Sequence, residues 1–356
     1  MGSRFVGRWR FNLALHKISL FRRQVRRQAT LATAVQITLG LVSVGLLFRK
    51  RKSPAEILAH DIGVYRDLSN LAQSLTERGN ATDAAKAFFL AVETCRTVVV
   101  RDPGRRQDLA SLLRGLGFAR SGETNLEGSL AAYNESEAIF RDLASADSKY
   151  LTDLAGVLSK SGAVLEKQGQ FKQAAEKISE SASMYRSLVS IGQTGLRTDV
   201  PGVLCNLGRV LQLSGKVQEG LEKLRESVSL LEGLLSEGYG NVESNLGVAL
   251  ANLGNGLILS GDKEGGLQVL QKGERLLQEV VDRGDRQSRF DLAKTKTFLG
   301  LAQIARGDFT GAIAKLSESS SLFQLLDKEG RADAKLELDA VRKYIGQAMQ
   351  AKARQP

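Results

Sequence analysis

The sequence predicts an all-α protein in which similar helix pairs are stacked in a row, preceded by one transmembrane helix. Apolar residues recur every three or four positions, which is typical of amphipathic helices, and the chain has only four prolines. A fixed period of roughly 20–50 residues indicates stacked repeats. Glycines predicted to form the turns recur with gaps of 43, 47, 46, 46 and 46 residues, at Gly79, Gly122, Gly169, Gly215, Gly261 and Gly307.

The segment 1–28 is cationic, weakly amphipathic and free of acidic residues. These features resemble a mitochondrial targeting sequence. The alternative is a basic cytosolic tail that orients a membrane anchor by the positive-inside rule.

Residues 29–48 are 20 consecutive uncharged residues, which is long enough for a helix to cross a bilayer. Arg26 and Arg27 precede the stretch, and the linker 49–55 begins with four basic residues. Dense charge on both flanks favours a membrane helix over a buried core helix. We expect a single-pass membrane protein, with the mitochondrion favoured and the endoplasmic reticulum or the bacterial inner membrane as alternatives. Basic residues on both sides leave open which side the repeats face.

All excess positive charge lies in this N-terminal part. Residues 1–52 hold 12 Lys and Arg and no acidic residue, so the remainder has a net charge of −1. The bulk of the chain therefore lacks the basic surface that a nucleic-acid partner requires.

The repeat unit has small residues at fixed places in its first helix. Leu-Gly pairs at 207–208, 253–254 and 299–300 each precede a turn glycine by seven or eight residues. Small residues let helices approach closely. The pattern resembles the tetratricopeptide repeat over residues 56–350, although the unit has 46 residues where the usual one has about 34. Long units of this kind are similar to those of kinesin light chains and some bacterial signalling proteins.

The resemblance implies a right-handed superhelical solenoid of about six helix pairs, thirteen helices in all with the last one. We assign the repeat array to residues 56–332 and a C-terminal capping helix and tail to residues 333–356. Repeat two has an irregular turn over residues 122–128, where the array is expected to bend or to be recognised.

In this family the first helix of each pair lines the concave face, where partners bind. Amide and basic side chains there can hold the backbone and carboxylates of an extended peptide; a merely solvated face is the alternative. Carrying the family's positions over gives Arg66, Asn70, Gln73, Lys160, Asn206, Arg209, Asn252, Asn255 and Lys294. The family's chaperone-tail clamp is not expected, because Cys205, Arg209 and Phe298 replace its Lys, Asn and Arg. A leucine cluster at 109–116 is expected to be core, with docking of an apolar helix as the alternative.

The chemistry-bearing residues are few. Two histidines and two cysteines, Cys95 and Cys205, make a zinc site, a disulfide framework or a His-based triad improbable. We therefore expect no enzyme, no cofactor and no small-molecule substrate. The resemblance implies a membrane-anchored scaffold that binds protein or peptide partners; the alternative is an import or chaperone receptor for transient peptide clients.

Overall fold

The computed structural model describes residues 53–331 and 333–354, and within them it contains thirteen α-helices and no strand. The predicted all-α solenoid of six helix pairs and a final helix is confirmed in this part of the chain. In chain order the helices are α3 (Pro54–Glu77), α4 (Ala81–Val99), α5 (Arg106–Gly122), α6 (Leu126–Ala146), α7 (Leu151–Lys167), α8 (Phe171–Ser190), α9 (Asp199–Leu213), α10 (Val217–Ser236), α11 (Glu243–Leu259), α12 (Lys263–Asp282), α13 (Arg289–Ala305), α14 (Phe309–Lys328) and α15 (Ala334–Ala353).

The targeting segment 1–28, the transmembrane stretch 29–48 and linker residues 49–52 lie outside the described residues. Among the helices of the described part, none combines the length and apolarity needed to cross a bilayer.

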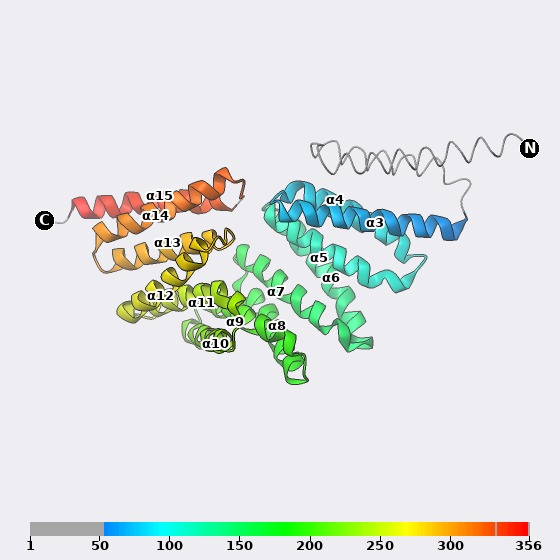
Figure 1. Cartoon of the computed structure of the whole chain (residues 1–356), viewed down its shortest axis with the longest axis horizontal. Coiled ribbons are helices and arrows are strands. Elements are labelled where there is room, and N and C mark those ends of the chain that lie inside the picture. Colours follow the sequence, from blue (N-terminus) through cyan, green and yellow to red (C-terminus); the bar gives the residue numbers. More distant parts are fainter. Residues whose placement is uncertain (1–52, 332, 355–356) are drawn as a thin grey trace, which may run out of the picture.

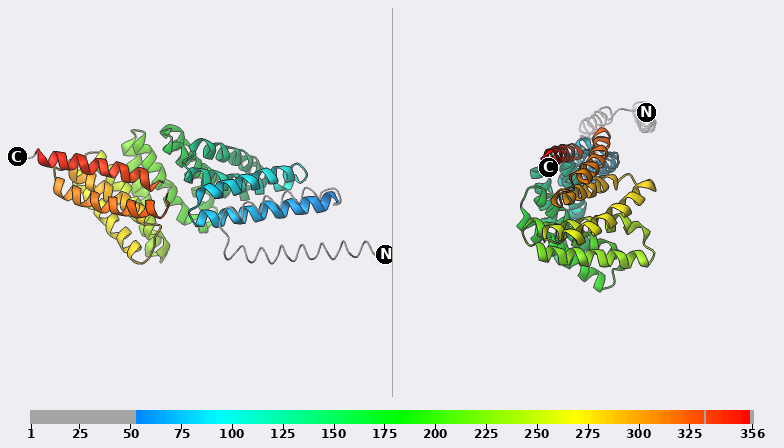
Figure 2. Two further views of the ribbon diagram at one scale, coloured as in Figure 1. Left: turned by 90° about the horizontal axis from the view of Figure 1, so that it is seen from above. Right: turned by 90° about the vertical axis from the view of Figure 1, so that its left-hand side faces the viewer.

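The helices form a curved row (Figure 1) in which each helix packs on its neighbours in sequence. Both ends of the row, α3 and α15, lie on the same side of the molecule, with α10 on the other side (Figures 1 and 2). Odd-numbered helices also contact the next odd-numbered helix, as α9 does α11 and α11 does α13. Even-numbered helices of the described array approach one another less closely. The odd-numbered helices therefore form the inner side of the curve.

Five of the six predicted turn glycines have the left-handed backbone conformation, with φ between +75° and +102°. The prediction for Gly122 is wrong. Gly122 is the last residue of α5, and the left-handed residue of that turn is Thr124, with φ +63°. Asn125 N–H, just after it, donates to the Arg120 carbonyl at 3.0 Å, the same contact that follows each turn glycine. Repeat two is thus regular: with Thr124 in place, the turn spacing is 45, 45, 46, 46 and 46 residues.

A second set of left-handed glycines ends the outer helices α8, α10, α12 and α14. Each lies 23 residues from the turn glycines on either side, and φ is between +87° and +102°. The following N–H donates to a carbonyl five residues back, as Gln193 does to Leu188 at 3.0 Å, which is the contact of a Schellman cap. The second half of the array therefore turns every 23 residues, at Gly169, Gly192, Gly215, Gly238, Gly261, Gly284, Gly307 and Gly330.

The core runs continuously between inner and outer helices. Leu109, Leu112, Leu113 and Leu116 are at most 7% exposed and belong to this core, which confirms the core interpretation of the leucine cluster. Fully buried serines of four outer helices tie each pair together, because each donates to a carbonyl of the inner helix 26 residues earlier. The four bonds are Ser136 to Ala110, Ser181 to Ala155, Ser227 to Pro201 and Ser319 to Ala293, at 2.7–2.8 Å.

A candidate binding face on the inner helices

The nine predicted partner-binding residues all lie on inner helices, on one face of each. Within a helix they are separated by three, four or seven residues, a spacing that places side chains on the same side. One face of α3 carries three of them, α7 carries one, and α9, α11 and α13 carry five. The placements are Arg66, Asn70 and Gln73 on α3; Lys160 on α7; Asn206 and Arg209 on α9; Asn252 and Asn255 on α11; and Lys294 on α13.

The structure brings five of these residues together and leaves four apart. Because α9 contacts α11 and α11 contacts α13, the five residues on these helices form one surface, which we call the inner patch. Arg66, Asn70 and Gln73 are exposed on α3, which is separated from the inner patch by α5 and α7. Lys160 is exposed on α7, at the edge of the patch.

Two residues of the inner patch are used inside the array. Arg209 forms an ion pair with Glu166 of α7 and also donates to Asn206 Oδ1 at 3.5 Å. Asn252 is only 8% exposed, and its Nδ2 donates to Cys205 Sγ at 3.3 Å. Burial raises the pKa of the Cys205 thiol to about 11, so the sulfur is an uncharged acceptor. These contacts join successive inner helices and fix the orientation of both side chains.

Asp291 is a member of the inner patch that sequence reasoning missed. It lies in the first turn of α13, three residues before Lys294. Burial raises the pKa of its carboxyl group, and the nearby charges of Lys294, Arg331 and Arg209 oppose that rise. The carboxylate therefore lies in a partly desolvated, mainly cationic setting.

A signal for Asp291 is present in the sequence. Acidic residues recur at the equivalent place in the first turn of four inner helices, at Asp108, Asp153, Asp199 and Asp291. The first two are paired: Asp108 accepts from Tyr65 Oη at 2.5 Å, and Asp153 from Arg114 at 2.6 Å. Among the described residues, no ion pair is formed by the last two.

The inner face also carries apolar side chains. Leu213 and Leu259 occupy equivalent positions at the ends of α9 and α11 and are 49% and 60% exposed. Phe118 of α5, at the place that Arg209 and Asn255 hold in later repeats, is 52% exposed. Amides, charges and exposed apolar groups together suit a polypeptide ligand with both backbone and side-chain contacts. In the part of the chain that the structure describes, no three His, Cys, Asp or Glu residues are grouped to bind a metal.

No protein-family model and no curated protein matches this chain. Among solved structures, aspartyl phosphate phosphatase F from Bacillus subtilis is similar at a TM-score of 0.55 and 15% identity, over 97% of this chain and 81% of the other. BtubC from P. vanneervenii has a TM-score of 0.52 and 19% identity, over 68% and 91%. The Rap conjugation gene regulator of plasmid pLS20, in complex with the Phr* peptide, has a TM-score of 0.51 and 13% identity, over 99% and 93%. At such identities the likeness shows the fold alone: the chain has a tetratricopeptide-like helical repeat fold.

Proposed function

We propose that this chain is a scaffold that holds an extended segment of a partner protein against the inner patch. The observation that carries the proposal is the group of three carboxamides, Asn206, Asn252 and Asn255, on two helices in direct contact. Because the Nδ2 of Asn252 is bound to Cys205, its Oδ1 is the atom left to accept from a ligand. Binding without catalysis is what such a surface supplies.

The spacing of the inner helices fits an extended ligand. Packed helices lie about 8–10 Å apart, and an extended chain advances about 3.3 Å per residue. Every third ligand residue would therefore meet an equivalent position on the next inner helix. The peptide complex of the pLS20 Rap regulator, whose fold is similar, supports a peptide ligand here.

The proposal includes a membrane tether through residues 29–48. Its support is the uncharged stretch of 20 residues with basic residues on both flanks. In this arrangement the array would hold its partner close to a membrane, with the mitochondrial membrane favoured by the acid-free segment 1–28.

Peptide selection on the full-length chain tests the binding face. Peptides enriched from a displayed random library are measured against the chain carrying Asn255→Ala or Lys294→Ala. We expect the Kd to rise about tenfold for each, which corresponds to about 1.4 kcal/mol. Asn134→Ala is the matched control, because Asn134 is exposed on the outer helix α6. Unchanged binding by both inner variants, with their melting temperatures unchanged, would show the binding face to be elsewhere.

The lifetime of the complex separates the two readings of the family resemblance. A scaffold is expected to hold its partner through purification, whereas a receptor for transient clients releases peptides within seconds. The tether is tested separately by alkaline carbonate extraction of membranes from cells that express the full-length chain. We expect the chain to stay in the membrane fraction and the variant lacking residues 29–48 to be released; release of both would refute the tether.

A further inference from the structure

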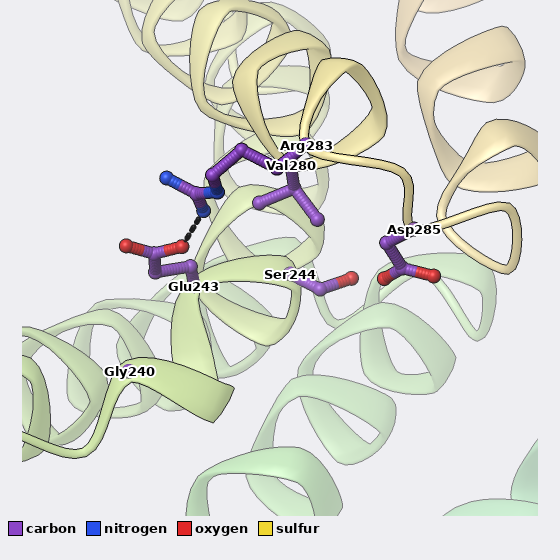
Figure 3. Close-up of a pocket in the computed structure, with 6 residues that line it drawn as sticks. All are labelled: Gly240, Glu243, Ser244, Val280, Arg283 and Asp285. Atoms are coloured by element: carbon purple, nitrogen blue, oxygen red, sulfur yellow. Dashed lines mark hydrogen bonds and ion pairs between the residues drawn. The ribbon is translucent and has the colours of Figure 1, made fainter.

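An open hollow of about 330 Å³ lies outside the inner patch, at the edge where outer helices connect to the next inner helices (Figure 3). On one side of the hollow, Glu243 of α11 and Arg283 of the α12–α13 connection form an ion pair. Ser244 and Asp285 lie on the other side. The lining is Gly240, Glu243, Ser244, Val280, Arg283 and Asp285.

The equivalent place one repeat later is filled by the protein itself. There Phe290 stands 46 residues after Ser244, and Arg331 stands 46 residues after Asp285. The Phe290 ring is 9% exposed, and the Arg331 guanidinium carbon lies 3.8 Å from its centre. One repeat earlier, Tyr239 stands in the place of Asp285. The hollow therefore exists because Ser244 and Asp285 replace larger side chains in one repeat only.

The frame around the hollow is the same in all three repeats. The two positions occupied by Glu243 and Arg283 form an ion pair in each, with the signs of the charges reversed in the middle repeat. The other two pairs are Arg197 with Glu237 at 2.7 Å and Arg289 with Glu329 at 3.1 Å. The backbone connections are thus held alike, and what the middle repeat lacks is the filling.

The charge inside the hollow is negative. Arg283 is neutralised by Glu243, which leaves the carboxylate of Asp285 without an opposite charge among the lining residues. Asp285 accepts from Ser288 Oγ at 2.7 Å and from the Gln287 N–H at 2.9 Å. These hydrogen bonds lower the pKa of the Asp285 carboxyl group, so it is ionised at neutral pH, and they fix its position.

We propose that this hollow binds an arginine side chain of a partner protein, with the guanidinium against the Asp285 carboxylate. The planar guanidinium matches a carboxylate with two donors, and the next repeat holds its own guanidinium, that of Arg331, at the equivalent place. The site is independent of the inner patch, so either proposal can fail without the other.

The test uses the full-length chain and the probe Nα-acetyl-arginine methylamide, with the citrulline analogue as an uncharged control of nearly equal shape. Saturation-transfer NMR and a titration give binding. We expect the citrulline analogue to bind at least about tenfold more weakly, and Asp285→Asn to weaken the arginine probe by a similar factor. Asn keeps an oxygen to accept from Ser288 and Gln287, so this variant is expected to fold normally.

The double variant Ser244→Phe with Asp285→Arg copies the next repeat and should fill the hollow. We expect it to abolish binding of the arginine probe and to leave the melting temperature unchanged or higher. Equal binding of the arginine and citrulline probes, or full binding by the folded double variant, would overturn the proposal. A peptide containing arginine should bind more tightly than the amino-acid probe; equal affinity would assign the hollow to a free small guanidinium compound and refute the partner side chain.

Discussion

Gly273→Ser places the residue that four other repeats carry into the one repeat that has lost it. The four buried serines at this position each tie an outer helix to an inner one through a 2.7–2.8 Å hydrogen bond. At Gly273, an added Cβ would lie 2.9 Å from the Gly247 carbonyl oxygen and 3.2 Å from the backbone nitrogen of Ala251. Both neighbours are backbone atoms of α11, so they cannot rotate away.

The magnitude follows from two opposing terms. The new hydroxyl can gain at most about 1 kcal/mol from a hydrogen bond to the inner helix. Overpacking against a rigid backbone costs about 1–3 kcal/mol. We therefore expect Gly273→Ser to lower the free energy of unfolding by about 1–2 kcal/mol, although it restores the residue typical of the repeat. Ser227→Ala, which removes one bond of the series without a clash, should cost about 1 kcal/mol.

Thermal and urea unfolding of the full-length chain, followed by circular dichroism, measure both variants. Hydrogen exchange in α11 and α12 locates the effect, because in a repeat array a local defect loosens the neighbouring interface first. We expect faster exchange in these two helices for Gly273→Ser. An unchanged or raised unfolding midpoint for Gly273→Ser would show that α11 and α12 can move apart freely and would refute the reasoning.

Three further outcomes are expected. Thr124→Gly should raise stability by about 0.5–1 kcal/mol, because left-handed strain of about 1–2 kcal/mol outweighs the added chain entropy of glycine; a lower urea midpoint would contradict this. Cys95 and Cys205 are buried, and burial raises their pKa to about 12 and about 11, so both should resist a thiol reagent at pH 8 until the chain unfolds, and stability should fall as pH rises from about 9 towards 11, since the unfolded thiols ionise first; rapid labelling of the native chain or stability constant over this range would argue otherwise. Lys296, 7% exposed and held by two glutamates, occupies a position that is leucine in earlier repeats, so Lys296→Leu should change stability by less than about 1 kcal/mol while Lys296→Ala costs about 2 or more, as compared by urea unfolding; equal losses would rule this out.

The period of the array was readable from glycine because φ near +80° is easy for glycine and costly for other residues. The same rule hid the turn at Thr124, whose identity carries no sign of a left-handed conformation. Gly122, two residues earlier, matched the pattern and was assigned in its place. The second series, from Gly192 to Gly330, is present in the sequence at a constant spacing, and a search at half the repeat length would have found it.

For the binding face, the sequence placed the nine residues on the correct helices but did not show their partners. The engagement of Arg209 by Glu166 and of Asn252 by Cys205 joins residues 43 and 47 positions apart. Such contacts depend on how far each inner helix is rotated and shifted against the next, which no local pattern states.

The sequence by itself determined the helices, their order and the length of the repeat, because turn glycines and apolar spacing act within a few residues. Tertiary structure alone decided which of the repeated positions are free to bind. Gly273 can be told from the buried serines as a letter, yet only the approach of α11 and α12 shows why a side chain is excluded there. Likewise Ser244 and Asp285 are ordinary polar residues in the chain, and the three-dimensional stacking of equal repeats turns their small size into a hollow.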